Sequence, residues 1–235
     1  MSGRDQILGK LRSKLGRAST TVSENAALNH MQAHQKNLIP ARGDLPKAQR
    51  VALFKQEAEK VNATVSELSH FGDVPNAVAD YLRQHQLPAA IKIAPHPGLK
   101  NLRWAEDTSI EVLDGRANGD DPVSVSVALG GVAETGTIVM ASGPDTPTSL
   151  NFLPLDHIVV VSADDIAGNY EAVWERLRAQ ADAAGRPGTL PRTVNWITGP
   201  SRTADIEQTL LLGAHGPQRL HILIVDGLET TAADA

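Results

Sequence analysis

The segment Glu134–Thr137 gathers side chains that could contact or attack a substrate. It follows an apolar run that ends in Gly130-Gly131, where a glycine pair permits a tight turn and a close approach of a ligand to the backbone. Its groups are a carboxylate, two hydroxyls and a glycine beside exposed backbone N–H groups: Glu134, Thr135, Thr137 and Gly136. Open α/β sheets place ligands at strand ends, so we expect a substrate-contacting loop here. The alternative is a β-hairpin turn with an exposed glutamate.

A second segment, Gly199–Glu207, reads Gly-Pro-Ser-Arg-Thr-Ala-Asp-Ile-Glu. We expect it to lead from a strand over 195–198 into a helix over about 204–212. Ser201 or Thr203 would cap that helix, because a hydroxyl accepts hydrogen bonds from the first free backbone N–H groups. A glycine-containing turn from a strand into a helix is also a common place for anions to bind.

The charges in this second segment indicate which kind of anion could bind to it. Asp205 and Glu207 would lie in the first helical turn and would repel a polyphosphate. A guanidinium binds a carboxylate through two hydrogen bonds, so Arg202 favours a small carboxylate as the ligand. The candidate binding residues here are Ser201, Arg202, Thr203 and Asp205. A capped helix that binds nothing is the alternative.

Two histidines could transfer protons. His215 lies between Gly213 and Pro217, which would end the helix, and it could serve as a general acid or base or simply stabilise the helix end. Asp156 and His157 are adjacent just before an apolar strand, so in an extended chain they would point to opposite faces and would not form a dyad.

Alternating helical and strand patterns must position these residues. Val123–Leu129 alternates apolar residues with serine and alanine, the clearest strand pattern in the chain. The other expected elements are helices over 47–61, 74–86 and 166–184 and strands over 64–68, 90–94, 137–141, 158–161 and 220–225. This alternation predicts an α/β fold, with residues 46–228 as one domain. Residues 1–45 are expected to form an N-terminal helix, 5–15, followed by an extended arm or a loosely packed helical segment.

Composition excludes several classes of function. The chain has 235 residues, of which only 3% are aromatic, which favours a core of Val, Ile, Leu and Ala. Its net charge of −5 argues against nucleic-acid binding. It contains 0 cysteines, so it cannot hold an iron–sulfur cluster or zinc ion through cysteine ligands, and no metal-ligand spacing stands out. No apolar run approaches the ~20 residues of a membrane span, and the charged N-terminus does not resemble a secretory signal, so we expect a cytoplasmic location.

Four segments in series resemble the LUD family: Ala133–Thr137, Leu153–His157, Gly199–Glu207 and Gly213–Pro217. The resemblance is strong over residues 119–226. It implies a parallel-rich sheet flanked by helices, as in the sugar-phosphate isomerase and coenzyme A transferase group. It also implies a role beside two iron–sulfur partner subunits in the cytoplasmic oxidation of L-lactate to pyruvate.

The absence of cysteine matches the cluster-free member of that system, which we expect to bind no cofactor directly and to contact a small 2-hydroxy or 2-keto acid or the partner subunits. One alternative is a stand-alone enzyme of the coenzyme A transferase or isomerase type, because enzymes of the wider group use a glutamate in a glycine-containing loop. Glu134 and His215 are then the candidate catalytic residues. The other alternative is a scaffold that binds the partner subunits through the N-terminal helix and arm.

Overall fold

Two helices, α1 (Gly3–Lys14) and α2 (Thr21–Ala33), form the described part of an N-terminal unit that extends to Ile39. The computed structural model describes residues 3–14, 21–36, 38–104, 109–203 and 211–227. Within this unit several large apolar side chains are exposed: Ile7, Leu8, Leu11, Leu28 and Met31. The second unit, from Pro40 to Ala235, contains every strand that the structure describes.

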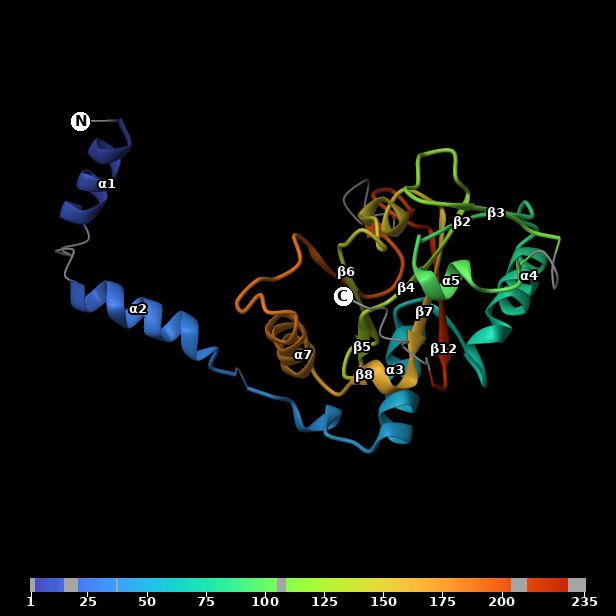
Figure 1. The fold of residues 1–235 in the computed structure, drawn as a ribbon, viewed down its shortest axis with the longest axis horizontal. Coiled ribbons are helices and arrows are strands. Elements are labelled where there is room, and N and C mark those ends of the chain that lie inside the picture. The colour runs from blue at the N-terminus through green and yellow to red at the C-terminus, as the bar shows by residue number, and fades with distance from the viewer. Residues whose placement is uncertain (1–2, 15–20, 37, 105–108, 204–210, 228–235) are drawn as a thin grey trace. The chain divides into compact units, whose positions relative to one another are not determined.

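Six parallel strands form the main sheet of the second unit (Figure 1). Their spatial order is β1 (Thr64–Leu68), β12 (Arg219–Val225), β7 (Asp156–Ser162), β4 (Val123–Val127), β2 (Ala90–Ile93) and β3 (Glu111–Asp114). The central strands β4 and β7 are buried along their whole length, as expected for strands covered on both faces.

Helices cover both faces of this sheet. One face packs on α4 (Val74–Gln84), which follows β1, and on the short α5 (Pro97–Lys100), which follows β2. The other face packs on α3 (Lys47–Lys60) through Phe54 and Ala58. The expected fold class, a parallel-rich sheet flanked by helices, is confirmed.

A second sheet of four strands lies against α3, and Figure 1 shows it on the opposite side of the main sheet from α4. Its order is β8 (Ile166–Ala167), β5 (Gly130–Val132), β6 (Thr137–Ala141) and β9 (Val194–Ile197), and its outer face packs on α7 (Tyr170–Ala183). The sequence pattern predicted one sheet and treated Gly130-Gly131 as a break between strands. Both glycines instead lie inside β5, where a Cβ atom on Gly130 would lie 2.6 Å from the Asp165 carbonyl oxygen and one on Gly131 would lie 2.9 Å from the Phe54 ring.

Two expected helices differ from the structure. The segment from Ile166 begins as β8, and α7 starts only at Tyr170, where the Asn169 side chain accepts the Ala172 N–H as an N-cap. After the Gly199 turn, β10 (Arg202–Thr203) pairs antiparallel with β11 (Leu211–Leu212), so the expectation that a helix ends at Leu212 is wrong. Residues 204–210 lie outside the described residues.

Short turns join the remaining elements. The 3-10 helices span Ala41–Gly43, Phe71–Asp73, Thr148–Asn151 and Ala163–Asp165. In the described parts of the chain, no helix is both long and apolar enough to cross a membrane.

Candidate functional site

Three of the four motif segments meet at a cavity of about 240 Å³ beside the amino ends of β7 and β12. We call it the amino-edge cavity. Its lining comes from the start of β7 and the segment before it, from the end of β9 and the turn after it, and from the start of β12 and the loop before it. The residues are Asn151, Phe152, His157, Trp196–Ser201, His215–Pro217 and Leu220. Two of the residues predicted to form the site, Ser201 and His215, therefore lie in the same cavity wall although they are far from adjacent in sequence.

Ser201 holds the two loops of that wall together. Its backbone N–H donates to the Pro217 carbonyl at 2.9 Å, and its own carbonyl accepts the Gly213 N–H at 2.9 Å. Its hydroxyl accepts the backbone N–H of His215 at 3.3 Å. These bonds fix the backbone of His215 while its side chain stays exposed at the cavity rim.

His157 is the most buried titratable group in the lining, with 1% of its surface exposed. Its Nε2 lies 2.6 Å from the Ser126 hydroxyl of β4, while Nδ1 is buried and has no hydrogen-bond partner in the described structure. If Ser126 donates its proton to Nε2, then Nδ1 carries the ring proton and can donate to a ligand oxygen; in the reverse arrangement it accepts. Burial lowers the pKa of His157 to about 3, so the ring is neutral at neutral pH.

The opposite face of the sheet holds Asp156. Arg219 donates to both of its carboxylate oxygens, at 2.5 and 2.8 Å, and the Tyr81 hydroxyl of α4 donates to it at 2.7 Å. Asp156 is fully buried and is satisfied by these partners. The prediction that Asp156 and His157 point to opposite faces is confirmed, and only His157 reaches the cavity.

The Glu134–Thr137 segment connects to the cavity through one hydroxyl pair, in which Thr137 Oγ1 lies 2.8 Å from Thr198 Oγ1. Thr135 Oγ1 lies 2.7 Å from Thr137 Oγ1, and both are 3.0 Å from the Tyr170 hydroxyl. These threonines thus bond to each other and to neighbouring protein groups. All four motif segments are thereby linked in one region of the structure.

Glu134 itself is buried, with 4% of its surface exposed, and it does not line the amino-edge cavity. Its Oε2 has no hydrogen-bond partner in the described residues. A buried carboxylate oxygen without a partner is costly, which makes it a feature in need of an explanation.

Gly136 and Gly199 bring both glycine-flanked segments against the C-terminal end of α3. Gly136 has φ +63° and a Cβ there would lie 2.1 Å from the backbone nitrogen of Ala58. Gly199 has φ +73° and a Cβ there would lie 2.3 Å from the carbonyl oxygen of Val61. At these two positions the absence of a side chain therefore lets the backbone at the end of α3 approach closely.

The remaining predicted residues lie outside the cavity lining. Arg202 and Thr203 belong to β10, and the Arg202 side chain is exposed. Asp205 lies outside the described residues. His215 follows β11 and its connecting turn at Gly213, so it does not occupy the last turn of a helix there.

Sequence reasoning did not single out Phe152, Trp196 or Thr198, which line the cavity, nor Ser126, which orients His157. Single aromatic and hydroxyl side chains have no spacing signature. Ser126 did carry a signal, because a serine inside a strand that is buried on both faces needs a hydrogen-bond partner.

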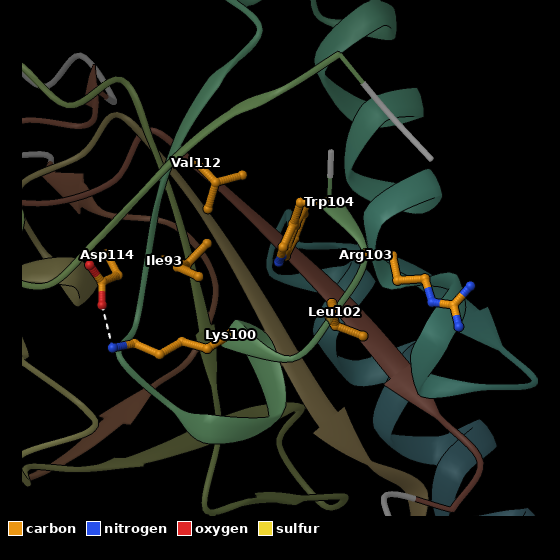
Figure 2. Close-up of a pocket in the computed structure, with 7 residues that line it drawn as sticks. All are labelled: Ile93, Lys100, Leu102, Arg103, Trp104, Val112 and Asp114. Carbon is orange, nitrogen blue, oxygen red and sulfur yellow. Dashed lines mark ion pairs between the residues drawn. The ribbon is translucent and has the colours of Figure 1, made fainter. Parts of the chain in front are cut away.

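A different hollow of about 490 Å³ lies beside β2 and β3. Figure 2 shows Lys100 and Asp114 facing one another in an ion pair, with Arg103 directed away from them. The Trp104 indole N–H donates to the Leu99 carbonyl at 2.8 Å. The charges of Lys100 and Asp114 neutralise one another, so we assign no ligand to this hollow. Among the described residues, no three His, Asp or Glu side chains are placed to hold a metal ion.

The chain matches the model of the LUD domain family over residues 51–225, and it belongs to that family. The matched region contains every segment of the amino-edge cavity and the Glu134 loop. The resemblance seen in the sequence motifs is confirmed.

Proteins similar to this chain carry the name Lactate utilization protein C. The one from Bacillus subtilis (strain 168) is 37% identical over 131 residues, which are 56% of this chain and 52% of that protein. The one from Geobacillus kaustophilus (strain HTA426) is 30% identical over 128 residues, 52% of each chain. The chain thus spans about half the length of these relatives, whereas its alignment to the Bacillus pumilus (strain SAFR-032) protein, 25% identical, covers 96% of this chain and 98% of that one.

The fold is also similar to a solved structure, that of a DUF162 family protein from Deinococcus radiodurans. The two are 22% identical, with a TM-score of 0.55, and the match covers 77% of this chain and 99% of the other.

Proposed function

We propose that this protein is a cluster-free component of a cytoplasmic system that oxidises L-lactate to pyruvate, and that its amino-edge cavity binds a small 2-hydroxy or 2-keto acid. The observation that carries the proposal is the convergence of three LUD motif segments on one cavity lined by His157, whose Nδ1 is buried and has no hydrogen-bond partner in the described structure. The relatives named Lactate utilization protein C supply the metabolic context.

The size and chemistry of the cavity favour such a ligand. Its volume of about 240 Å³ is below the roughly 300–1,000 Å³ of pockets for drug-sized ligands. Nδ1 of His157 would bond to a carboxylate, hydroxyl or keto oxygen of the acid, which would satisfy a buried group that otherwise has no partner. Arg202, which follows Ser201 in the chain and is always positively charged, would favour a negatively charged ligand.

The absence of cysteine supports a cluster-free role for this protein in the proposed system. Oxidation of lactate releases electrons, and with 0 cysteines this chain has no thiolate ligands for an iron–sulfur cluster. We therefore propose iron–sulfur protein subunits as its partners and no directly bound cofactor.

Isothermal titration calorimetry of the full chain with L-lactate and with pyruvate tests the proposed ligand. We expect saturable binding, and we expect His157→Gln to weaken it about tenfold or more, because the lost hydrogen bond is buried. Ser126→Ala, which leaves the imidazole in place but no longer fixes its tautomer, should weaken binding less. His70→Gln, an exposed histidine outside the cavity, is the matched control. Absence of saturable binding by the wild-type chain contradicts the proposal.

The partnerless Oε2 of Glu134 favours a second candidate, an enzyme of the coenzyme A transferase type with Glu134 as the nucleophile. Incubation with an acyl-coenzyme A and trapping with borohydride should then change the intact mass at Glu134 and leave Glu134→Gln unlabelled. An unlabelled wild-type chain counts against this candidate.

A third candidate is a scaffold, favoured by the exposed apolar residues on α1 and α2. Removal of residues 1–39 would then abolish co-purification with partner subunits while leaving binding of the small acid unchanged.

A further inference from the structure

A second, larger cavity of about 710 Å³ lies at the other end of the parallel strands. It is lined by His96–Gly98, which follow β2, by Val127–Leu129 at the carboxyl end of β4, and by Ala141–Thr146, which begin at the last residue of β6. We call it the carboxyl-edge cavity. It shares no lining residue with the amino-edge cavity among those that the structure describes.

The topology of the main sheet points to this cavity. Within the main sheet, the strand that follows β2 is β3 on one side, whereas the strand that follows β4, after β5 and β6 of the second sheet, is β7 on the other side, and β2 and β4 are neighbours. The next strands of the main sheet after β2 and β4 therefore lie in opposite directions, and residues that follow β2 and end β4 line the cavity. In open α/β sheets, ligands bind at such a switch point.

The hydrogen-bonding groups in the cavity are of two complementary kinds. Nδ1 of His96 accepts the backbone N–H of Gly98 at 3.1 Å, so in the neutral ring Nε2 carries the proton and is a donor. Burial lowers the pKa of His96, which favours this neutral form. Asp145, exposed on the loop after β6, and Asp165 supply carboxylate acceptors.

The charge of the lining argues against an anionic ligand. No lysine or arginine is among the described residues that line the cavity. Arg176 lies nearby, but it already donates to the Asp165 side chain at 2.9 Å and to the Asp165 carbonyl at 3.1 Å. A phosphate or carboxylate would therefore meet acidic groups without a cation to bind it.

The rest of the surface is apolar and includes an aromatic ring. Phe71, Pro97 and Leu102 belong to one part of the wall, and Val127 and Pro144 to others. Aromatic and apolar side chains of this kind favour a flat ring. A ligand that combines a ring with hydroxyl groups would use both the apolar wall and the carboxylates.

From these observations we infer that the carboxyl-edge cavity binds a nucleoside, with its ring against the apolar wall and its ribose hydroxyls donating to Asp145. In dinucleotide-binding α/β folds an acidic side chain likewise accepts the ribose hydroxyls. The inference is independent of the proposed binding of a 2-hydroxy or 2-keto acid, because that acid would occupy the other end of the strands.

Calorimetric titration of the full chain with adenosine tests the inference. We expect saturable binding by the wild-type chain and binding about tenfold weaker or more for 2′,3′-dideoxyadenosine, which lacks both hydroxyls. Asp145→Asn should weaken adenosine binding to a similar degree, because a neutral amide is a poorer acceptor than a carboxylate. Asp120→Asn, an exposed aspartate outside the cavity, is the matched control and should leave adenosine affinity unchanged.

Three results would overturn the inference: absence of saturable adenosine binding, equal affinity for the dideoxy compound, or unchanged affinity of Asp145→Asn. Asp145 is exposed, so we expect the variant to fold, and circular dichroism melting verifies this. Titration of Asp145→Asn with pyruvate shows whether the substitution also affects the amino-edge cavity. Loss of adenosine binding alone supports the carboxyl-edge cavity, whereas parallel loss of both ligands would contradict two independent sites.

Discussion

Two buried histidines, His157 and His221, have lowered pKa values that make the stability of the fold depend on pH. Burial, with a smaller contribution from nearby His85, lowers the pKa of His221 to about 4, and its Nδ1 lies 2.7 Å from the Thr64 hydroxyl. His157 has its pKa lowered still further, to about 3, by burial. Both rings are therefore neutral in the folded protein at pH values where they would be protonated in the unfolded chain.

This difference gives the stability of the protein a defined pH dependence. The folded-state pKa values lie below the unfolded value of about 6.5, so the unfolded chain binds more protons as the pH falls. We expect the neutral histidine rings to contribute fully to the free energy of unfolding above pH 6.5. As the pH falls toward 4 this contribution is progressively lost, by an amount on the order of 3 kcal/mol for His221. Urea unfolding at a series of pH values should show that the free energy of unfolding depends less steeply on pH for His221→Asn than for the wild type. Equal slopes for His221→Asn and wild type would contradict this account.

At the scale of elements, the C-terminal end of α3 positions both glycine-flanked segments. Gly136 and Gly199 combine positive φ angles with contacts too close for any Cβ atom. The Glu134 loop and the cavity wall are thus held at a fixed position relative to the same helix, and the Thr137–Thr198 hydroxyl pair joins them directly.

Substitution of these glycines should lower the free energy of unfolding far more than substitution of a glycine that has no atoms near its Cβ position. We expect Gly136→Ala to lower the free energy of unfolding by more than about 3 kcal/mol, because positive φ and a clash with the α3 backbone add together. Gly188 also has a positive φ, +73°, but nothing within 4 Å of its Cβ position, so Gly188→Ala should cost only about 1 kcal/mol. Denaturant unfolding of both variants measures the difference, and similar losses would show that the contact with α3 is unimportant.

The sequence predicted the long elements well and the short ones poorly. The alternation in Val123–Leu129 and the helical stripe of α4 reflect burial on defined faces, which leaves a period that can be recognised. The two-residue strands β8, β10 and β11 are too short to show a period, and their pairing depends on segments far away in the chain. Ser201 and His215 could be predicted as site residues from their local sequence. The cavity that they share with Trp196 could not be predicted, because it is formed by segments that are separated along the chain.

At the scale of the whole molecule, the hydrophobic core belongs to the second unit. All the buried residues of the core clusters lie between Phe54 and Val225. None of them belongs to the residues of the N-terminal unit, Met1–Ile39, that the structure describes.

A chain that starts at Pro40 should therefore keep the fold of the α/β unit. We expect its melting temperature to stay within a few degrees of that of the full chain, because the packed core is unchanged. Differential scanning calorimetry of both chains measures this. A large drop in melting temperature would show that the N-terminal unit stabilises the α/β unit.

The central claim is that the amino-edge cavity binds a small 2-hydroxy or 2-keto acid through His157, and nuclear magnetic resonance of the histidine ring nitrogens during titration with pyruvate tests it most directly. We expect the Nδ1 resonance of His157 and the amide resonances of Ser201 and His215 to shift along one saturable curve, while the ring of His96 in the carboxyl-edge cavity stays unchanged. No saturable shift at His157, or shifts confined to residues outside the amino-edge cavity, would contradict the account.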